Sequence, residues 1–107
     1  MQVNLKPITW LGNSQEVVRN WPIAVRKLAG AELMRLQMGS EPLHWKPMKA
    51  VGRGVKEIRI SQGGAYRVFY VVRRREGISV LHAFEKKSRR TAMSDIDMGK
   101  QRFMSEK

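Results

Sequence analysis

The sequence predicts a single α+β domain in which helices pack on an antiparallel sheet. Residues 23–38 carry apolar side chains at helical spacing, and residues 65–73 alternate in the manner of a strand. Only short, turn-like segments separate the three strand-like runs between residues 55 and 84, which favours antiparallel neighbours. A chain of 107 residues has the length of one domain, which we expect to cover residues 1–107.

The N-terminal third predicts one strand and two helices. Residues 5–10 contain β-branched and aromatic side chains that suit a short first strand. A turn signal at residues 12–14 then precedes a short helix beginning at Gln15. Pro22 separates this helix from a second one over residues 23–38.

The remainder predicts a loop, three strands and a last helix. Residues 41–54 contain Pro and Gly at several positions and predict an extended loop. The last helix begins near Thr91 or Ser94. We expect the helices to cover one face of the sheet, which leaves the other face free to hold a basic groove. The strands are expected over residues 55–61, 65–73 and 78–84.

The chain is strongly basic, and the excess charge is concentrated in its middle. Twenty-one Lys and Arg residues against nine Asp and Glu give a net charge of +12. Residues 46–90 hold thirteen basic and three acidic groups, a net of +10. This block predicts a polyanionic partner, with nucleic acid ahead of an acidic protein. An anionic membrane surface ranks third, because no strongly hydrophobic amphipathic segment supports it.

Several classes of function are excluded by residues that the sequence lacks. It has no cysteine, which excludes a disulfide framework, a cysteine zinc site and a thiol nucleophile. The two histidines, His44 and His82, have no carboxylate cluster beside them, so we expect neither a metal site nor a cofactor. The apolar runs are too short to span a membrane, and residues 1–11 lack a continuous apolar core. We therefore expect a cytoplasmic protein with no membrane partner.

The candidate site consists of cationic side chains on the predicted strands. Alternation places Glu57 and Arg59 on one face of their strand, and Arg67 lies on the next strand. Lys86 and Lys87 end the third strand. Convergent guanidinium and ammonium groups bind the oxygens of a scissile phosphate and stabilise its transition state. For any single residue the alternative is a solvated strand face, whereas the clustered set favours nucleic-acid binding.

Other residues of the basic block are candidates for contact with nucleic acid. Trp45 is expected in core or lid packing, with stacking on a base as the alternative. His82 has apolar neighbours and is expected to be half-buried, with a role in proton transfer as the alternative. The predicted nucleic-acid-binding residues are Lys46, Lys49, Arg53, Lys56, Arg89 and Arg90.

Four segments carry a resemblance to a known family: WKPMK at 45–49, GVKEIRI at 54–60, YRVFY at 66–70 and LHAFEKK at 81–87. In this order they resemble the RelE/ParE toxin superfamily, and most closely its phage-derived HigB-like branch. The resemblance implies a RelE-like fold, with an N-terminal strand and two helices packed on a curved antiparallel sheet and a C-terminal helix.

The resemblance also implies a function. It implies a toxin of a type II toxin–antitoxin pair that acts as a ribosome-dependent mRNA endoribonuclease and inhibits translation. In RelE-like members the ribose 2′-hydroxyl attacks the neighbouring phosphate, so neither a protein nucleophile nor a metal is needed. The implied partners are mRNA, the ribosome and a cognate helix-turn-helix antitoxin of the HigA kind. The alternatives are a ParE-like, non-enzymatic inhibitor of DNA gyrase and an inert, basic nucleic-acid-binding module of phage origin.

The resemblance assigns roles to individual residues. Arg59 matches a basic position that lines the active groove, and Arg67 matches the arginine that holds the phosphate. Lys86 and Lys87 match a basic pair that stabilises the transition state or the leaving group. The chain departs from the family at Glu57, which stands where the best-known members have a second basic residue. Glu57 is expected either to act as the general base or to orient Arg59.

Overall fold

The computed structural model describes residues 4–106, and within this range the chain forms five strands and three helices. Residues 1–3 and Lys107 lie outside the described residues. Residues 1–3 belong to the segment 1–11, in which the sequence predicts no signal peptide. In chain order the elements are β1 (Ile8–Trp10), α1 (Ser14–Arg19), α2 (Ile23–Gln37), β2 (Trp45–Pro47), β3 (Lys56–Ser61), β4 (Ala65–Arg73), β5 (Gly77–Lys86) and α3 (Met93–Ser105).

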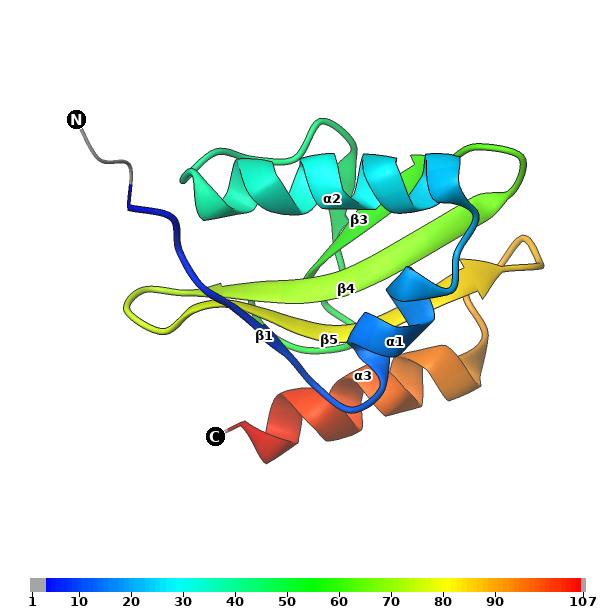
Figure 1. Cartoon of the computed structure of the whole chain (residues 1–107). Coiled ribbons are helices and arrows are strands. Elements are labelled where there is room, and N and C mark those ends of the chain that lie inside the picture. The colour runs from blue at the N-terminus through cyan, green and yellow to red at the C-terminus, as the bar shows by residue number, and fades with distance from the viewer. Residues whose placement is uncertain (1–3, 107) are drawn as a thin grey trace.

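The strands form one mixed sheet in the order β1-β5-β4-β3-β2 (Figure 1). Its centre is the antiparallel meander β3-β4-β5, which confirms the three strands predicted from alternation. β1 adds a parallel edge, with Ile8 opposite Ile78 of β5. Parallel pairing is possible here because the long connection from β1 to β5 contains two helices and three strands.

β2 corrects the prediction that residues 41–54 are a loop throughout. It pairs antiparallel with β3, and Trp45 lies opposite Ile58. Pro47 ends this three-residue strand, a position that proline tolerates because an edge strand needs fewer ladder hydrogen bonds. The exposed edge of β3 thus decides the conformation of a segment whose own composition favours a loop.

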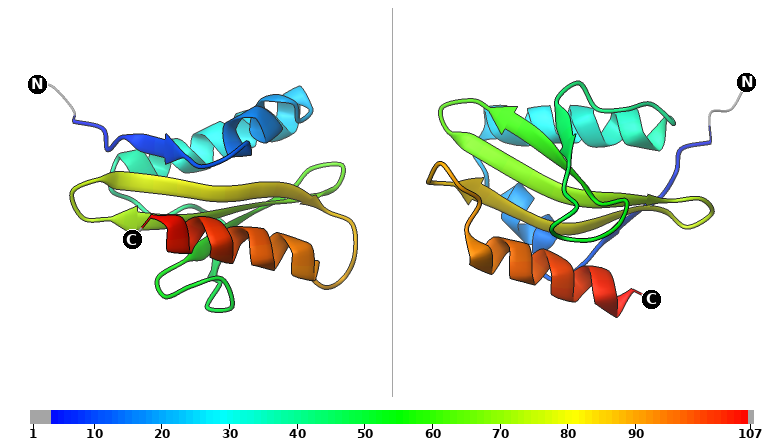
Figure 2. Two further views of the ribbon diagram at one scale, coloured as in Figure 1. Left: turned by 90° about the horizontal axis from the view of Figure 1, so that it is seen from below. Right: turned by 180° about the vertical axis from the view of Figure 1, so that it is seen from behind.

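Helices cover both faces of the sheet, as the view along the layers shows (Figure 2). α1 and α2 lie on one face, and α3 lies on the other together with residues 48–55. The α+β class is confirmed, but the expectation that all helices share one face is wrong for α3. None of the helices in residues 4–106 has the length and apolar character needed to cross a bilayer.

The layer formed by α2 follows the predicted apolar stripe. Val25, Ala29, Leu33 and Leu36 are buried against the sheet at steps of four, four and three residues. This spacing places them on one side of the helix, where they cover the apolar side chains of β3, β4 and β5. The stripe therefore fixes the orientation of α2 over the sheet.

The layer formed by α3 depends on one aromatic residue and one glycine. Phe103 is buried with Phe69 and Val51 in a second core cluster. A Cβ atom added at Gly99 would lie 2.9 Å from side-chain carbons of both Phe69 and Val51. Glycine therefore lets the helix backbone approach the sheet closely.

We expect Phe103→Ala to lower the free energy of unfolding by about 3 kcal/mol, because it leaves a cavity between α3 and the sheet. Met104→Ala is the matched control, since Met104 is the next residue and is exposed. It should change stability by less than about 0.5 kcal/mol. Denaturant unfolding of both variants measures the difference, and equal values would contradict the packing of α3 described here.

Candidate functional site

An open pocket of about 390 Å³ lies beside β2 and β3, on the part of the sheet that α3 leaves uncovered. It contains both arginines of the predicted catalytic set and one residue of the predicted nucleic-acid-binding set. The lining residues are Leu43, His44, Trp45, Lys46, Arg59, Ser61 and Arg67.

Strand register brings the two arginines together on one face. Arg59 of β3 lies opposite Arg67 of β4, which lies opposite Phe84 of β5. The row continues toward β2, because the backbone N–H of Arg59 donates to the carbonyl oxygen of His44 at 2.9 Å. Opposed residues of antiparallel strands point to the same face. Arg59 and Arg67 therefore point to the same face, and His44 lies beside Arg59 among the residues that line the pocket.

The carboxylate of Glu57, two residues before Arg59 on β3, forms ion pairs with both arginines. Its side chain is only 7 % exposed, and Oε1 lies 3.6 Å from Nε of Arg59 and 3.8 Å from Nε of Arg67. Nη1 of Arg67 also donates to the carbonyl oxygen of Tyr66 at 2.9 Å. Both ion pairs use Nε atoms, so they do not compete for the Nη groups of Arg59. Glu57 thus positions two guanidinium groups side by side at the pocket.

The electrostatics of this trio favour binding of an anion. Arg67 is buried, and this burial, followed by the charge of Arg59, lowers its pKa, while Glu57 acts in the opposite sense. A guanidinium stays protonated at neutral pH even so. Two fixed cations thus share a single carboxylate, which leaves a net positive charge in a partly desolvated place. A phosphate group has the size, charge and acceptor oxygens to occupy such a site.

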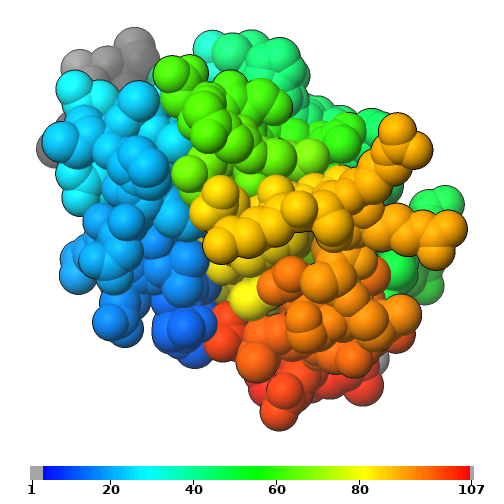
Figure 3. Space-filling model, turned by 90° about the vertical axis from the view of Figure 1, so that its right-hand side faces the viewer, coloured from blue at the N-terminus to red at the C-terminus, as the bar shows by residue number. Residues whose placement is uncertain are grey.

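Lys86 shares the face of the arginine pair, because it lies opposite Ala65 at the end of β5. Lys87 follows the strand and is exposed, as are Arg89 and Arg90 in the loop between β5 and α3. This loop, coloured orange, projects from the surface beside the green turn between β3 and β4 (Figure 3). The cationic surface therefore extends from the pocket toward the end of β5.

The remaining predicted nucleic-acid-binding residues lie in three places. Lys46 is exposed at the pocket, opposite Glu57. Lys49 and Arg53 are exposed on the segment that joins β2 and β3, away from the pocket lining. Lys56 belongs to the other face of β3, where its Nζ lies 4.4 Å from the ring centroid of Trp45.

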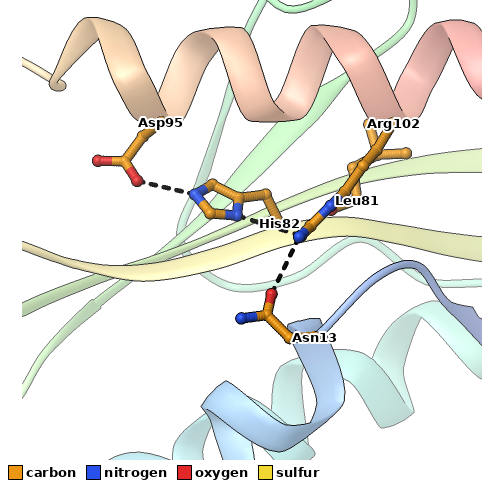
Figure 4. Close-up of polar contacts among 5 residues, drawn as sticks. All are labelled: Asn13, Leu81, His82, Asp95 and Arg102. Atoms are coloured by element: carbon orange, nitrogen blue, oxygen red, sulfur yellow. Dashed lines mark hydrogen bonds and ion pairs between the residues drawn. The ribbon is translucent and has the colours of Figure 1, made fainter.

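His82 belongs to a separate polar cluster under α3 (Figure 4). Its Nε2 lies 2.8 Å from Oδ1 of Asp95, and its Nδ1 lies 3.4 Å from Nη1 of Arg102. Arg102 also donates to the carbonyl oxygen of Leu81 and to Oδ1 of Asn13, and its burial lowers its pKa. The cluster joins α3 to β5 and to the start of α1. Both ring nitrogens of His82 thus have partners within the protein.

The sequence prediction missed His44, which lines the pocket, and Glu32, which holds His44 there. The carboxylate of Glu32, buried on α2, accepts hydrogen bonds at 3.0 Å from the backbone N–H groups of Leu43 and His44. These bonds fix the loop before β2 and place His44 at the pocket. The available signal was an acidic residue beside the apolar stripe of a helix, because a buried carboxylate requires partners.

In residues 4–106 no three potential ligand side chains gather as a metal site would require.

A three-layer α+β fold of RelE-like type, with a cationic pocket on its sheet, defines the class of this protein. The model of one family, described as phage-derived protein Gp49-like (DUF891), matches residues 16–104. The chain therefore belongs to this family, which is a RelE-like toxin family. Membership of a toxin family implies an antitoxin partner. No curated protein matches the chain.

We expect Glu57→Gln to lower the free energy of unfolding by about 3 kcal/mol, because it leaves the buried Arg67 without its counter-charge. Glu41→Gln is the matched control, since it removes a carboxylate that pairs with Lys56 at an exposed place. The control should cost less than about 1 kcal/mol. Urea unfolding of the two variants checks this difference. A loss no greater than that of the control would show that Glu57 does not hold the arginine pair.

Proposed function

We propose that this protein is a HigB-like toxin that cleaves mRNA on the ribosome and thereby inhibits translation. The arginine pair, fixed by Glu57 at an open pocket, is the observation that carries the proposal. A site of this form binds the phosphate of an RNA chain and needs no protein nucleophile, since the ribose 2′-hydroxyl supplies one. The proposed enzyme is a metal-independent endoribonuclease of the cytoplasm.

The reaction begins when Arg59 and Arg67 bind the non-bridging oxygens of the scissile phosphate. Attack of the 2′-oxygen forms a five-coordinate phosphorus with additional negative charge, which the two guanidinium groups stabilise. Cleavage of the bond to the 5′-oxygen yields a 2′,3′-cyclic phosphate and a 5′-hydroxyl. Lys86 and Lys87 stabilise the leaving oxygen from the end of β5.

Glu57 serves this reaction as a positioning residue. The alternative role, general base, requires the carboxylate to accept a proton from the substrate. Glu57 is buried, and its Oε1 already lies within 4 Å of the guanidinium groups of Arg59 and Arg67. These contacts support the orienting role, in which Glu57 holds Arg59 and Arg67 in place.

The exposed basic residues around the pocket bind the RNA backbone and the ribosomal surface. Lys56 is left out of this set, because it pairs with Glu41 on the other face of β3. Binding through many phosphate contacts weakens steeply as salt is raised. A helix-turn-helix antitoxin of the HigA kind is the proposed inhibitor, and an acidic segment of it would neutralise this surface. The proposed set is Lys46, Lys49, Arg53, Arg89 and Arg90.

The proposed activity predicts cuts only in mRNA that is being translated. The measurement is a map of mRNA 5′ ends in a cell-free translation reaction, with and without the purified protein. One transcript is compared with a copy that lacks its ribosome-binding site. Cuts within or between codons, confined to the translated copy, are expected. Intact transcripts in both reactions would reject the nuclease, and inhibition of DNA gyrase supercoiling would then favour the ParE-like alternative.

We expect Arg67→Ala to abolish cleavage while the protein stays folded, because alanine removes one of the two guanidinium groups that together bind the phosphate. Arg74→Ala is the charge-matched control, since Arg74 is exposed at the hairpin tip between β4 and β5. It should cleave at nearly the wild-type rate. Cleavage by a well-folded Arg67→Ala protein would remove Arg67 from the active site.

A further inference from the structure

We propose that His44 is the general base of the cleavage reaction, and that it removes the proton from the attacking 2′-hydroxyl. This inference rests on the proposed function and adds a catalytic residue to it. In the sequence, His44 stands as an isolated histidine in a segment rich in proline and glycine. The structure places it in the same pocket as Arg59 and Arg67.

The position of His44 follows from the hydrogen bonds of its backbone. Its carbonyl oxygen accepts from Arg59 N–H at 2.9 Å, and its own N–H donates to Glu32 Oε2 at 3.0 Å. The first bond aligns His44 with Arg59 across the edge of the sheet. The second ties the loop to α2. The backbone of His44 is therefore held on both sides, as a group that must meet a substrate with defined geometry requires.

The side chain of His44 is available for chemistry, in contrast to that of His82. His44 is exposed at the pocket and its ring makes no hydrogen bond or ion pair within residues 4–106. The His82 ring is engaged at both nitrogens by Asp95 and Arg102. Histidine is the residue type that exchanges a proton most readily near neutral pH. Of the two histidines, His44 is thus the one that can act on a bound ligand.

A second argument comes from the order of residues across the sheet. In-line displacement puts the entering 2′-oxygen and the leaving 5′-oxygen on opposite sides of the phosphorus. His44 lies beside Arg59 on the β2 side. On the β5 side Arg67 lies opposite Phe84, and Lys86 lies two residues further along β5, opposite Ala65. His44 and Lys86 therefore lie toward opposite edges of the sheet, with the arginine pair on the strands between them. The ammonium group of Lys86 is a proton donor, which leaves the acceptor role to His44.

The step balances without any further reactant. The neutral imidazole of His44 takes the 2′-hydroxyl proton as the 2′-oxygen forms its bond to phosphorus. The bond from phosphorus to the 5′-oxygen breaks, and its electron pair stays on the 5′-oxygen. Lys86 gives a proton to that oxygen, so the products are the cyclic phosphate and a 5′-hydroxyl. Histidine and lysine then regain their initial protonation states by exchange with water.

The first test is the single-turnover rate of cleavage on ribosome complexes programmed with a defined mRNA. We expect His44→Ala to lower this rate by about 100-fold or more, in the range of general-base catalysis. His44→Gln, which keeps a polar side chain, should be as slow. Binding of both variants to the ribosome should stay within about threefold of wild type, since the arginine pair is intact.

Ser40→Ala is the control, because Ser40 is an exposed residue of the same loop and does not line the pocket. It should cleave at the wild-type rate. A folded His44→Ala protein that cleaves as fast as Ser40→Ala, while the wild type is active, overturns the role of His44 and leaves the proposed nuclease intact. Absence of cleavage by the wild type on the same complexes overturns the nuclease itself and the role of His44 with it.

A modified substrate separates the base from the acid. Replacement of the bridging 5′-oxygen by sulfur gives a leaving group that departs without a proton. On this mRNA we expect His44→Ala to remain as slow relative to wild type as it is on the ordinary mRNA. Lys86→Ala should cleave it at nearly the wild-type rate. Recovery of the His44→Ala rate on the sulfur substrate would instead identify His44 as the acid and overturn its assignment as the base.

Discussion

The site depends on one buried carboxylate placed between two cations. Arg59 and Arg67 lie directly opposite each other on neighbouring strands, an arrangement in which like charges oppose strand pairing. Glu57 offsets that repulsion, because its Oε1 lies 3.6 Å from Nε of Arg59 and 3.8 Å from Nε of Arg67. Strand register ties the three residues together, because a slip of one residue would turn the charged side chains of β3 into the apolar core. The electrostatic requirement and the pairing of β3 with β4 thus reinforce each other.

The parts of the fold that the sequence predicts are those decided by local pattern. Alternation and short turns define the meander, and the stripe from Val25 to Leu36 defines α2. Tertiary contacts decide the rest. β2 forms because β3 offers an unpaired edge, although Pro47 and its neighbours favour a loop. α3 covers the second face through Gly99 and Phe103, two positions whose meaning depends on what lies opposite them.

The residues of the candidate site likewise divide into those that local sequence pattern predicts and those that tertiary contacts put in place. Arg59 and Arg67 are accessible to sequence reasoning because each belongs to a strand whose faces can be assigned by alternation. His44 is not, since its place depends on a short edge strand and on the hydrogen bond that its N–H donates to Glu32 of α2. Glu32 looks like an imperfection in an apolar stripe until its two backbone partners are seen. In this protein the buried acid on the apolar face of α2 is the residue that fixes the loop before β2.

The parallel pairing of β1 with β5 limits how early the sheet can be completed while the chain is being synthesised. Ile8 pairs with Ile78, so β1 cannot join the sheet until β5 has left the ribosome that makes the chain. The apolar side of α2 has no complete surface to cover during that time and stays open to aggregation or to capture by chaperones. Contacts that join such distant parts of a chain also form slowly. The N-terminal strand therefore finds its place in the sheet only when a partner about seventy residues further along the chain has formed.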